Sequence, residues 1–212
     1  MKKPLQIEDF DLAVHPKIHN SPVVMHRYLP ICLIIGLMVA FRAVGSAFAD
    51  SLPNFQPLGA LFFCGAMLAP GWRGFAIPAG IWAITYPLGI GPISDVSVFL
   101  STLVGLSATY FLGRALVSRG LPVLLSGSIA AAVLFHLITN GFAWVADPIY
   151  QKSLTGLWQS LWTGPAGSTL PSWIFLRNLT AANLLFTGIF VCAQFKLPKL
   201  SISAHNALII NK

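Results

Sequence analysis

Charged residues are scarce in this chain of 212 residues. Asp, Glu, Lys and Arg together make up 9% of it, against 56% hydrophobic residues, and the mean hydropathy is +0.75. So apolar a composition excludes an ordinary soluble domain. Only six residues are acidic, which leaves a net charge of +7. A nucleic-acid-binding domain gathers such charge on one face, whereas here it lies at the borders of apolar runs, so we expect no nucleic-acid partner.

The motifs of several enzyme and metal-site classes are also missing. The three cysteines, Cys32, Cys64 and Cys192, each lie within an apolar run and form no CxxC pair, which excludes a disulfide framework or a zinc ribbon. There is no HExxH motif, phosphate loop or pair of glutamates in an apolar run. Ser126 and Ser128 share a predicted helix with His136, an arrangement that does not place a nucleophile across a cleft from its base. We therefore predict binding rather than catalysis.

Six apolar runs account for most of the chain. A membrane crossing takes about 20 apolar residues as a helix, so the runs predict an all-α, polytopic membrane protein with six transmembrane helices in one bundle. The expected organisation is an N-terminal cytoplasmic tail (1–28), a transmembrane domain (29–195) and a C-terminal cytoplasmic tail (196–212). The runs are 29–49, 57–69, 74–90, 96–116, 121–145 and 173–195.

The positive charges sort onto one side of such a bundle. Lys152 is the one cation predicted on the other side, and Arg42 and Arg177 lie inside apolar runs. Because cationic loops resist translocation, both termini are expected in the cytoplasm, beside anionic lipid. Ala47-Phe48-Ala49 also fits a signal-peptide cleavage site, but the long leading segment with three acidic residues disfavours cleavage. The ten residues on the cytoplasmic side are Lys2, Lys3, Lys17, Arg27, Arg73, Arg114, Arg119, Lys196, Lys199 and Lys212.

Two segments on the outer side have unusual patterns. The second run is too short to cross a bilayer of ordinary thickness on its own. Either it is tilted against its neighbours in a thinned bilayer, or the segment before it (53–56) dips into the bundle. Non-helical backbone at that depth is tolerated only beside protein or a wet cavity, so a pocket is expected there. Residues 150–162 place Tyr, Leu and Trp at helical spacing, which predicts an interfacial helix on the outer surface.

Polar side chains inside apolar runs are the candidates for binding. Arg42 and Arg177 lie toward the outer side, where they can pair with Asp50 or Asp95, contact a polar ligand, or extend to the interface. His136 and Asn140 share a helix face, and a buried, hydrogen-bonded histidine is the simpler interpretation. Cys64 is a packing residue or, because thiolates are soft ligands, one ligand of a metal.

Three short segments resemble a family of small bacterial membrane proteins. Residues 54–66 read NFQPLGALFFCGA and fit the pattern N-F-x-P-x-x-A-x-x-x-x-G, and residues 139–144 and 176–179 read TNGFAW and LRNL. The chain is similar to the BtuM proteins, the cobalamin-specific S components of energy-coupling-factor transporters. The resemblance spans about 29–195 in architecture and implies an S-component-like fold in the bacterial cytoplasmic membrane.

The resemblance implies cobalamin as bound substrate, captured from outside, with Cys64 as axial ligand of its cobalt. The implied apolar chamber is lined by Phe62, Phe63 and Tyr86, and Phe55 belongs to the matching motif. A transmembrane coupling subunit with its ATPases would dock on the small residues of the first run. The alternatives are a carrier for another vitamin or metal, and a membrane scaffold without a ligand. The implied polar contacts are Arg42, Asn54, Asn140 and Arg177, and the implied docking residues are Gly36, Ala40, Ala43 and Ala47.

Overall fold

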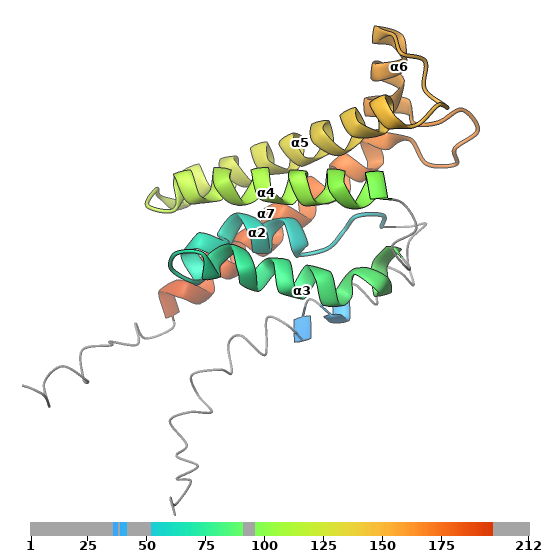
Figure 1. Ribbon diagram of the computed structural model, residues 1–212. Helices are drawn as coiled ribbons and strands as arrows, with labels where there is room; N and C mark the ends of the chain where they lie inside the picture. Colours follow the sequence, from blue (N-terminus) through green and yellow to red (C-terminus); the bar gives the residue numbers. More distant parts are fainter. Residues whose placement is uncertain (1–35, 38, 42–51, 91–95, 197–212) are drawn as a thin grey trace, which may run out of the picture. The chain divides into compact units, whose positions relative to one another are not determined.

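The computed structural model describes residues 36–37, 39–41, 52–90 and 96–196, all within one compact unit, Ile35–Lys212. This part of the chain is helical and contains no strand, as predicted (Figure 1). The predicted tails and most of the first apolar run lie outside it. The helices are α2 (Leu58–Leu68), α3 (Arg73–Ile90), α4 (Val96–Leu116), α5 (Leu121–Ala146), α6 (Leu154–Trp158), the π-helical turn η1 (Gln159–Thr163) and α7 (Ser172–Lys196).

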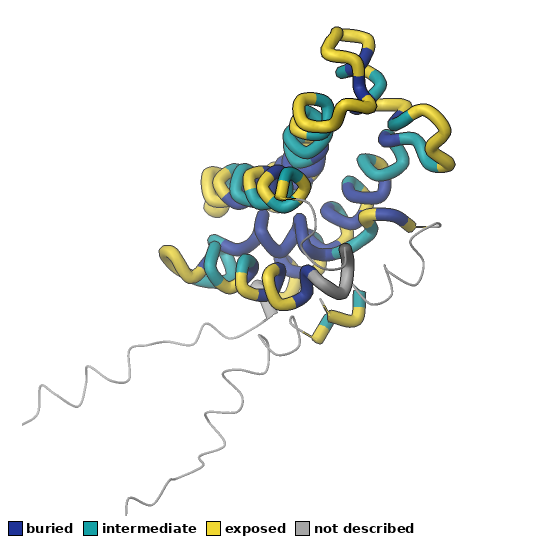
Figure 2. Tube along the Cα trace, turned by 45° about the vertical axis from the view of Figure 1, so that its right-hand side comes forward, coloured by how far each residue is buried: buried dark blue, intermediate teal, exposed yellow. Residues whose placement is uncertain are grey.

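The short helix α2 lies at the centre of the described helices and packs against α3, α4, α5 and α7. Eight of its eleven residues are buried. An amphipathic helix buries one stripe, whereas a helix enclosed on all sides is apolar all round, as the sequence LGALFFCGAML of α2 is. In Figure 2 the buried segments gather where the helices face one another, and the outward faces are exposed.

Glycines allow the backbones around α2 to approach closely. A Cβ on Gly113 of α4 would overlap the carbonyl group of Phe63 in α2. Gly65 of α2 and Gly74 of α3 face each other in the same way, because a Cβ on either would overlap the carbonyl of the other. Small residues at helix contacts replace the hydrophobic driving force that is missing between helices in lipid. These contacts hold α2 against both neighbours.

Three described helices are long and apolar enough to cross a membrane: Val96–Leu116, Leu121–Ala146 and Ser172–Ala193, with mean hydropathies of 1.6, 2.1 and 1.5. Large apolar side chains such as Phe111, Leu137 and Leu185 are exposed on them, the pattern of a surface that faces lipid rather than water. The helix α2, with 11 residues, extends only about 16 Å at 1.5 Å per residue. These features are consistent with a membrane protein.

The apolar runs predicted five of the helices to within a few residues, and α4 coincides with its run. The expected interfacial helix over 150–162 is shorter at its start. Ser153 is extended, and its hydroxyl accepts a hydrogen bond of 3.2 Å from the Gly156 amide, so the helix begins at Leu154. Gly156 is required there because a Cβ would overlap the carbonyl of Gln151.

Candidate functional site

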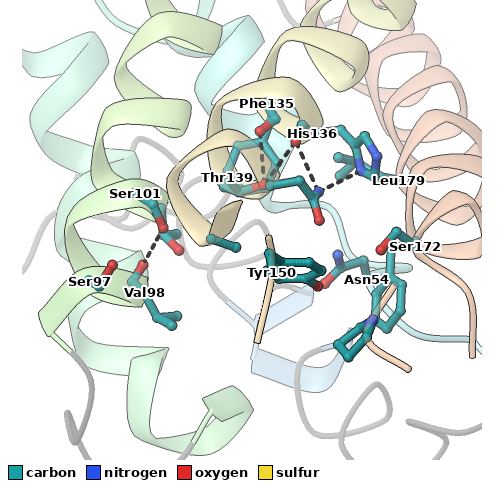
Figure 3. A pocket seen from close by; sticks show the side chains of 15 residues that line it. Asn54, Ser97, Val98, Ser101, Phe135, His136, Thr139, Tyr150, Ser172 and Leu179 are labelled. Carbon is teal, nitrogen blue, oxygen red and sulfur yellow. Dashed lines mark hydrogen bonds between the residues drawn. The ribbon is translucent and has the colours of Figure 1, made fainter. Parts of the chain in front are cut away.

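Two adjoining cavities lie between the helices. The larger, the end chamber, has a volume of about 310 Å³ and lies among the start of α4, the end of α5 and the start of α7. Figure 3 shows Asn54 and Ser172 on one side of it and Ser97, Val98 and Ser101 on the other. Its remaining lining residues are Thr102, Phe135, His136, Thr139, Asn140, Ala143, Tyr150, Pro165, Phe175 and Leu179.

The second cavity, the inner chamber, has a volume of about 200 Å³ and reaches the middle of α3, α4 and α7 through Trp82, Thr109 and Asn183. The two chambers share part of their walls and therefore adjoin each other. The end chamber falls at the lower end of the ~300–1,000 Å³ typical of small-molecule pockets, and the inner chamber is smaller than that range. The residues that line both are Asn54, Val98, Thr102, Phe135, Thr139 and Leu179.

Asn54 reaches both chambers from the turn that precedes α2. It has a positive φ of 60°, the left-handed region that asparagine tolerates better than most residues. The turn is fixed to α7 because the side-chain amide of Asn178 donates a buried hydrogen bond of 3.0 Å to the carbonyl oxygen of Pro53. Pro57 then begins α2. This is the non-helical segment that the sequence predicted beside a pocket.

Changing Asn54 separates its backbone role from its side-chain role. Asn54→Gly is expected to melt at the wild-type temperature, since glycine accepts a positive φ. It is expected to bind the ligand more weakly, because the side-chain amide is removed. Asn54→Val is expected to destabilise the protein by about 1–2 kcal/mol, the cost of a left-handed conformation for an ordinary residue. Thermal unfolding in detergent measures this difference. Equal melting temperatures for both variants would contradict the assigned strain.

His136 is the centre of a polar network near the C-terminal end of α5. It is buried, and its Nε2 atom lies 2.9 Å from the carbonyl oxygen of Leu161 in η1. Its Nδ1 atom lies 3.1 Å from the amide nitrogen of Asn140. A carbonyl only accepts and an amide nitrogen only donates, so Nε2 carries the proton and Nδ1 accepts. The buried, hydrogen-bonded histidine predicted from the sequence is confirmed.

The same network fastens α6 and η1, here called the cap segment (residues 154–163), over the end of α5. The hydroxyl of Ser160 donates a 2.7 Å hydrogen bond to the carbonyl oxygen of Asn140. Tyr150, which lines the end chamber, is bonded to Ser160 in turn. Burial raises the pKa of Tyr150, the bond to Ser160 partly opposes this, and the carboxylate of Asp147 adds to the rise. Tyr150 therefore presents a neutral phenol to the chamber.

Of the predicted binding residues, Asn54 and Asn140 are brought together at the end chamber. The aromatic residues take up packing positions and line neither chamber. Phe55 lies 6.2 Å from Phe186, between ring centroids, and Phe62 packs edge-on to Phe75. Phe63 is fully buried below Gly113, and Tyr86 packs against Trp82 and Phe99.

The candidate metal ligand and the two arginines also lie away from the chambers, as far as they are described. Cys64 has no exposed surface, lies beside the hydroxyl of Thr187 and lines neither chamber. No cluster of His, Cys, Asp and Glu that could hold a metal occurs in the described part of the chain. Arg42 lies outside that part. Arg177 is exposed and stacks over the ring of Trp173 at 5.4 Å from its centroid.

That arginine ends a row of stacked aromatic rings that runs from the cap segment to Trp173 in α7. Trp173 lies 6.4 Å from Trp162, and Trp162 lies 5.8 Å from Trp158, between ring centroids. Trp158 and Leu154 are among the most exposed large side chains described. Indole rings favour the headgroup layer of a bilayer, the location that the sequence predicts for this segment.

The comparison with known families concerns nearly the whole chain. Residues 24–204 match DUF6580, a family of unknown function. The chain belongs to this family. Neither a curated protein nor a solved structure matches it. The match covers all the described helices, so both chambers lie within the DUF6580 region.

Sequence patterns singled out Asn54 but not the inner-chamber residues that lie on α3, α4 and α7. Trp82, Thr109 and Asn183 lie in apolar runs and belong to no recognised motif. The available signal was Asn183, because an amide in the middle of an apolar helix usually faces the bundle interior or a cavity. The serines and threonine of α4 in the end chamber, Ser97, Ser101 and Thr102, carry no distinct pattern at all.

Proposed function

We propose that this chain binds a small organic solute in the two chambers and serves as the substrate-binding component of a membrane uptake transporter. The observation that supports it most is the pair of adjoining cavities, on which polar groups of α4, α5, α7 and the turn before α2 converge. Concave sites with apolar walls and a few convergent polar groups are the usual form of small-molecule sites. The ring nitrogens of His136 are both engaged, which suits positioning rather than acid–base catalysis.

The proposed membrane arrangement follows the charge sorting. Six helices cross the bacterial cytoplasmic membrane, both termini lie in the cytoplasm, and the end chamber opens toward the outer side. The row of tryptophans on the cap segment then lies in the outer headgroup layer. The docking face proposed for a coupling subunit begins at Gly36 and Ala40, which are exposed, while Ala43 and Ala47 lie outside the described residues.

The first ligand proposed is cobalamin, on the strength of the BtuM resemblance. Its cobalt is soft enough to accept sulfur, and the corrin ring fills the four equatorial positions, so a single thiol is sufficient as an axial ligand. Because Cys64 is enclosed in the described conformation, α2 and the turn at Asn54 would have to move apart from α7 to admit the corrin. Asn54 and Asn140 would then form hydrogen bonds with its amide groups.

The test is the visible spectrum of protein purified with cobalamin and desalted. The wild-type protein is expected to stay red with an altered cobalt spectrum. Cys64→Ser, which changes one small group, is expected to lose that alteration and to bind at least about tenfold more weakly, equivalent to about 1.4 kcal/mol. The matched control is Cys192→Ser, since Cys192 is exposed. Unchanged spectra in both variants would assign Cys64 to packing.

A second candidate is a smaller uncharged solute, such as another vitamin. The enclosed position of Cys64 and a chamber of about 310 Å³ favour it, because cobalamin exceeds the drug-sized ligands that such volumes hold. The protein purified with cobalamin also distinguishes cobalamin from a smaller solute as the ligand. A colourless protein that gives no calorimetric heat with corrinoids, but does with a smaller solute, would replace cobalamin with that solute.

A further inference from the structure

The inner chamber is built without charge. Its wall contains three amides (Asn54, Gln56 and Asn183), two side chains with a hydroxyl group from α4 and one from α5, and an indole. Every other lining residue is apolar or glycine. An ionic ligand placed there would lose its hydration without gaining an opposite charge, which is costly in a low-dielectric site. The chamber therefore selects against ions and for an uncharged group.

Three buried polar atoms on this wall have no hydrogen-bond partner among the described residues: Trp82 Nε1, Thr109 Oγ1 and Asn183 Oδ1. Their residues are 3%, 1% and 1% exposed and come from three different helices. Buried polar groups are nearly always bonded, so each exception calls for an explanation. Three exceptions on one cavity point to a group that occupies it.

Thr109 lacks the local bond that several hydroxyl residues of the described helices make. Among the described residues Thr187 of α7 also has an unpaired buried hydroxyl, but it lines neither chamber. Ser107 and Thr139 donate to the carbonyl oxygens of Leu103 and Phe135 one turn earlier, at 2.7 and 3.0 Å. This bond is the local way for a helical hydroxyl to be satisfied. Thr109 makes no such bond, so the hydroxyl of this lining residue has no local partner.

The other two groups are held in defined orientations. The Nδ2 atom of Asn183 donates to the carbonyl oxygen of Ser128 at 3.2 Å. Its Oδ1 atom faces Gly59, where a Cβ would overlap it. Rotating the amide would set its oxygen against the carbonyl of Ser128, so Oδ1 remains the acceptor. Trp82 is held by stacking on Phe99, with ring centroids 5.0 Å apart.

We propose that the inner chamber binds the uncharged amide-type group of a ligand, in which a carbonyl acceptor and an N–H donor lie side by side. The indole N–H of Trp82 donates to the carbonyl oxygen, and Oδ1 of Asn183 accepts from the N–H. The hydroxyl of Thr109 can do either. A carboxylate would leave Asn183 unsatisfied, and an ammonium group would leave Trp82 unsatisfied. This inference rests on the proposed ligand-binding role but requires neither cobalamin nor transport.

The probe is benzamide, and the matched anion is benzoate. In detergent-solubilised ¹⁵N-labelled protein, benzamide is expected to shift the indole N–H resonance of Trp82 saturably, with a Kd on the order of 1 mM for so small a ligand. Benzoate is expected to bind at least about tenfold more weakly. The resonance is assigned by its loss in Trp82→Phe.

The decisive variant is Thr109→Val, which replaces the hydroxyl with a methyl group of similar size. It is expected to weaken benzamide binding about tenfold while leaving the melting temperature of the free protein unchanged or higher, because it removes a buried unpaired group. The control is Thr85→Val, at a buried threonine that lines neither chamber and donates to Ile81 at 2.7 Å. It is expected to lower the melting temperature and to keep benzamide binding.

Three outcomes would overturn the inference. One is no saturable shift with benzamide, and another is equal binding of benzamide and benzoate. The third is a lower melting temperature of Thr109→Val with unchanged binding, which would mean that a buried water bonds the Thr109 hydroxyl and that benzamide does not. The proposed function fails separately. If benzamide binds through Thr109 but cells do not accumulate a solute, the binding site proposed for the inner chamber is retained and the transport role is wrong. If cells accumulate a solute equally well with the wild-type protein and with Thr109→Val, the transport role is retained and the binding site is wrong.

Discussion

Gly113→Ala is expected to destabilise the protein by about 3 kcal/mol or more. The added Cβ would overlap the backbone carbonyl of Phe63, and a main-chain group of an enclosed helix cannot turn aside as a flexible side chain does. Overpacking in a close-packed interior costs about 1–3 kcal/mol, and more when backbones must separate. Because α2 carries one wall of the inner chamber, ligand affinity is expected to fall together with the melting temperature.

The matched control is Gly188→Ala in α7, where a Cβ would meet nothing within 4 Å. Alanine in an open helical position gains about 0.5–1 kcal/mol over glycine, so this variant is expected to be as stable as the wild type or more so. Thermal unfolding of both variants in the same detergent makes the comparison. If Gly113→Ala has the same melting temperature as Gly188→Ala, the close approach of α2 and α4 is not as described.

The second large effect is expected from His136→Phe, which keeps the ring volume and removes both ring hydrogen bonds. The carbonyl of Leu161 then loses its imidazole partner, at about 1–3 kcal/mol for a buried group left unpaired. The amide of Asn140 loses its bond to Nδ1 but keeps its 3.0 Å bond to the carbonyl oxygen of residue 136. The substitution therefore weakens the attachment of the cap segment to α5. Hydrogen exchange of residues 154–163 is therefore expected to accelerate by at least about tenfold, and ligand dissociation to accelerate with it.

Ser107→Ala provides the control for His136→Phe. It removes a hydrogen bond of 2.7 Å within α4 and leaves the cap segment untouched, so exchange in residues 154–163 should remain at the wild-type rate. An unaltered exchange rate in His136→Phe would show that Ser160 and Tyr150 alone hold the segment, and the role assigned to the imidazole would be wrong.

The helices were predictable from the sequence because long apolar runs bounded by Gly, Pro and charge leave few alternatives. The run at 96–116 became α4 without change. The pocket beside Asn54 was also predictable, because a proline-rich turn cannot enter a bilayer unless protein covers it. Both inferences need only local composition and length.

The orientation of individual side chains was not predictable in the same way. A helix such as α2 is apolar on every face, so no stripe indicates which of Phe62, Phe63 and Cys64 faces a cavity. All three turned out to be enclosed. In α7 the opposite difficulty arises: Asn183 and Arg177 are both polar interruptions, yet one lines the inner chamber and the other is exposed. Only the packing of neighbouring helices decides such cases.

The enclosure of α2 has a consequence for biosynthesis. This helix is too short to remain in lipid by itself, and the partners α4, α5 and α7 that surround it are all made after it. We therefore expect α2 to wait in the insertion machinery or at the bilayer surface until the later helices emerge. The binding chambers, whose walls include residues as late as Asn183, then form in the last stage of synthesis.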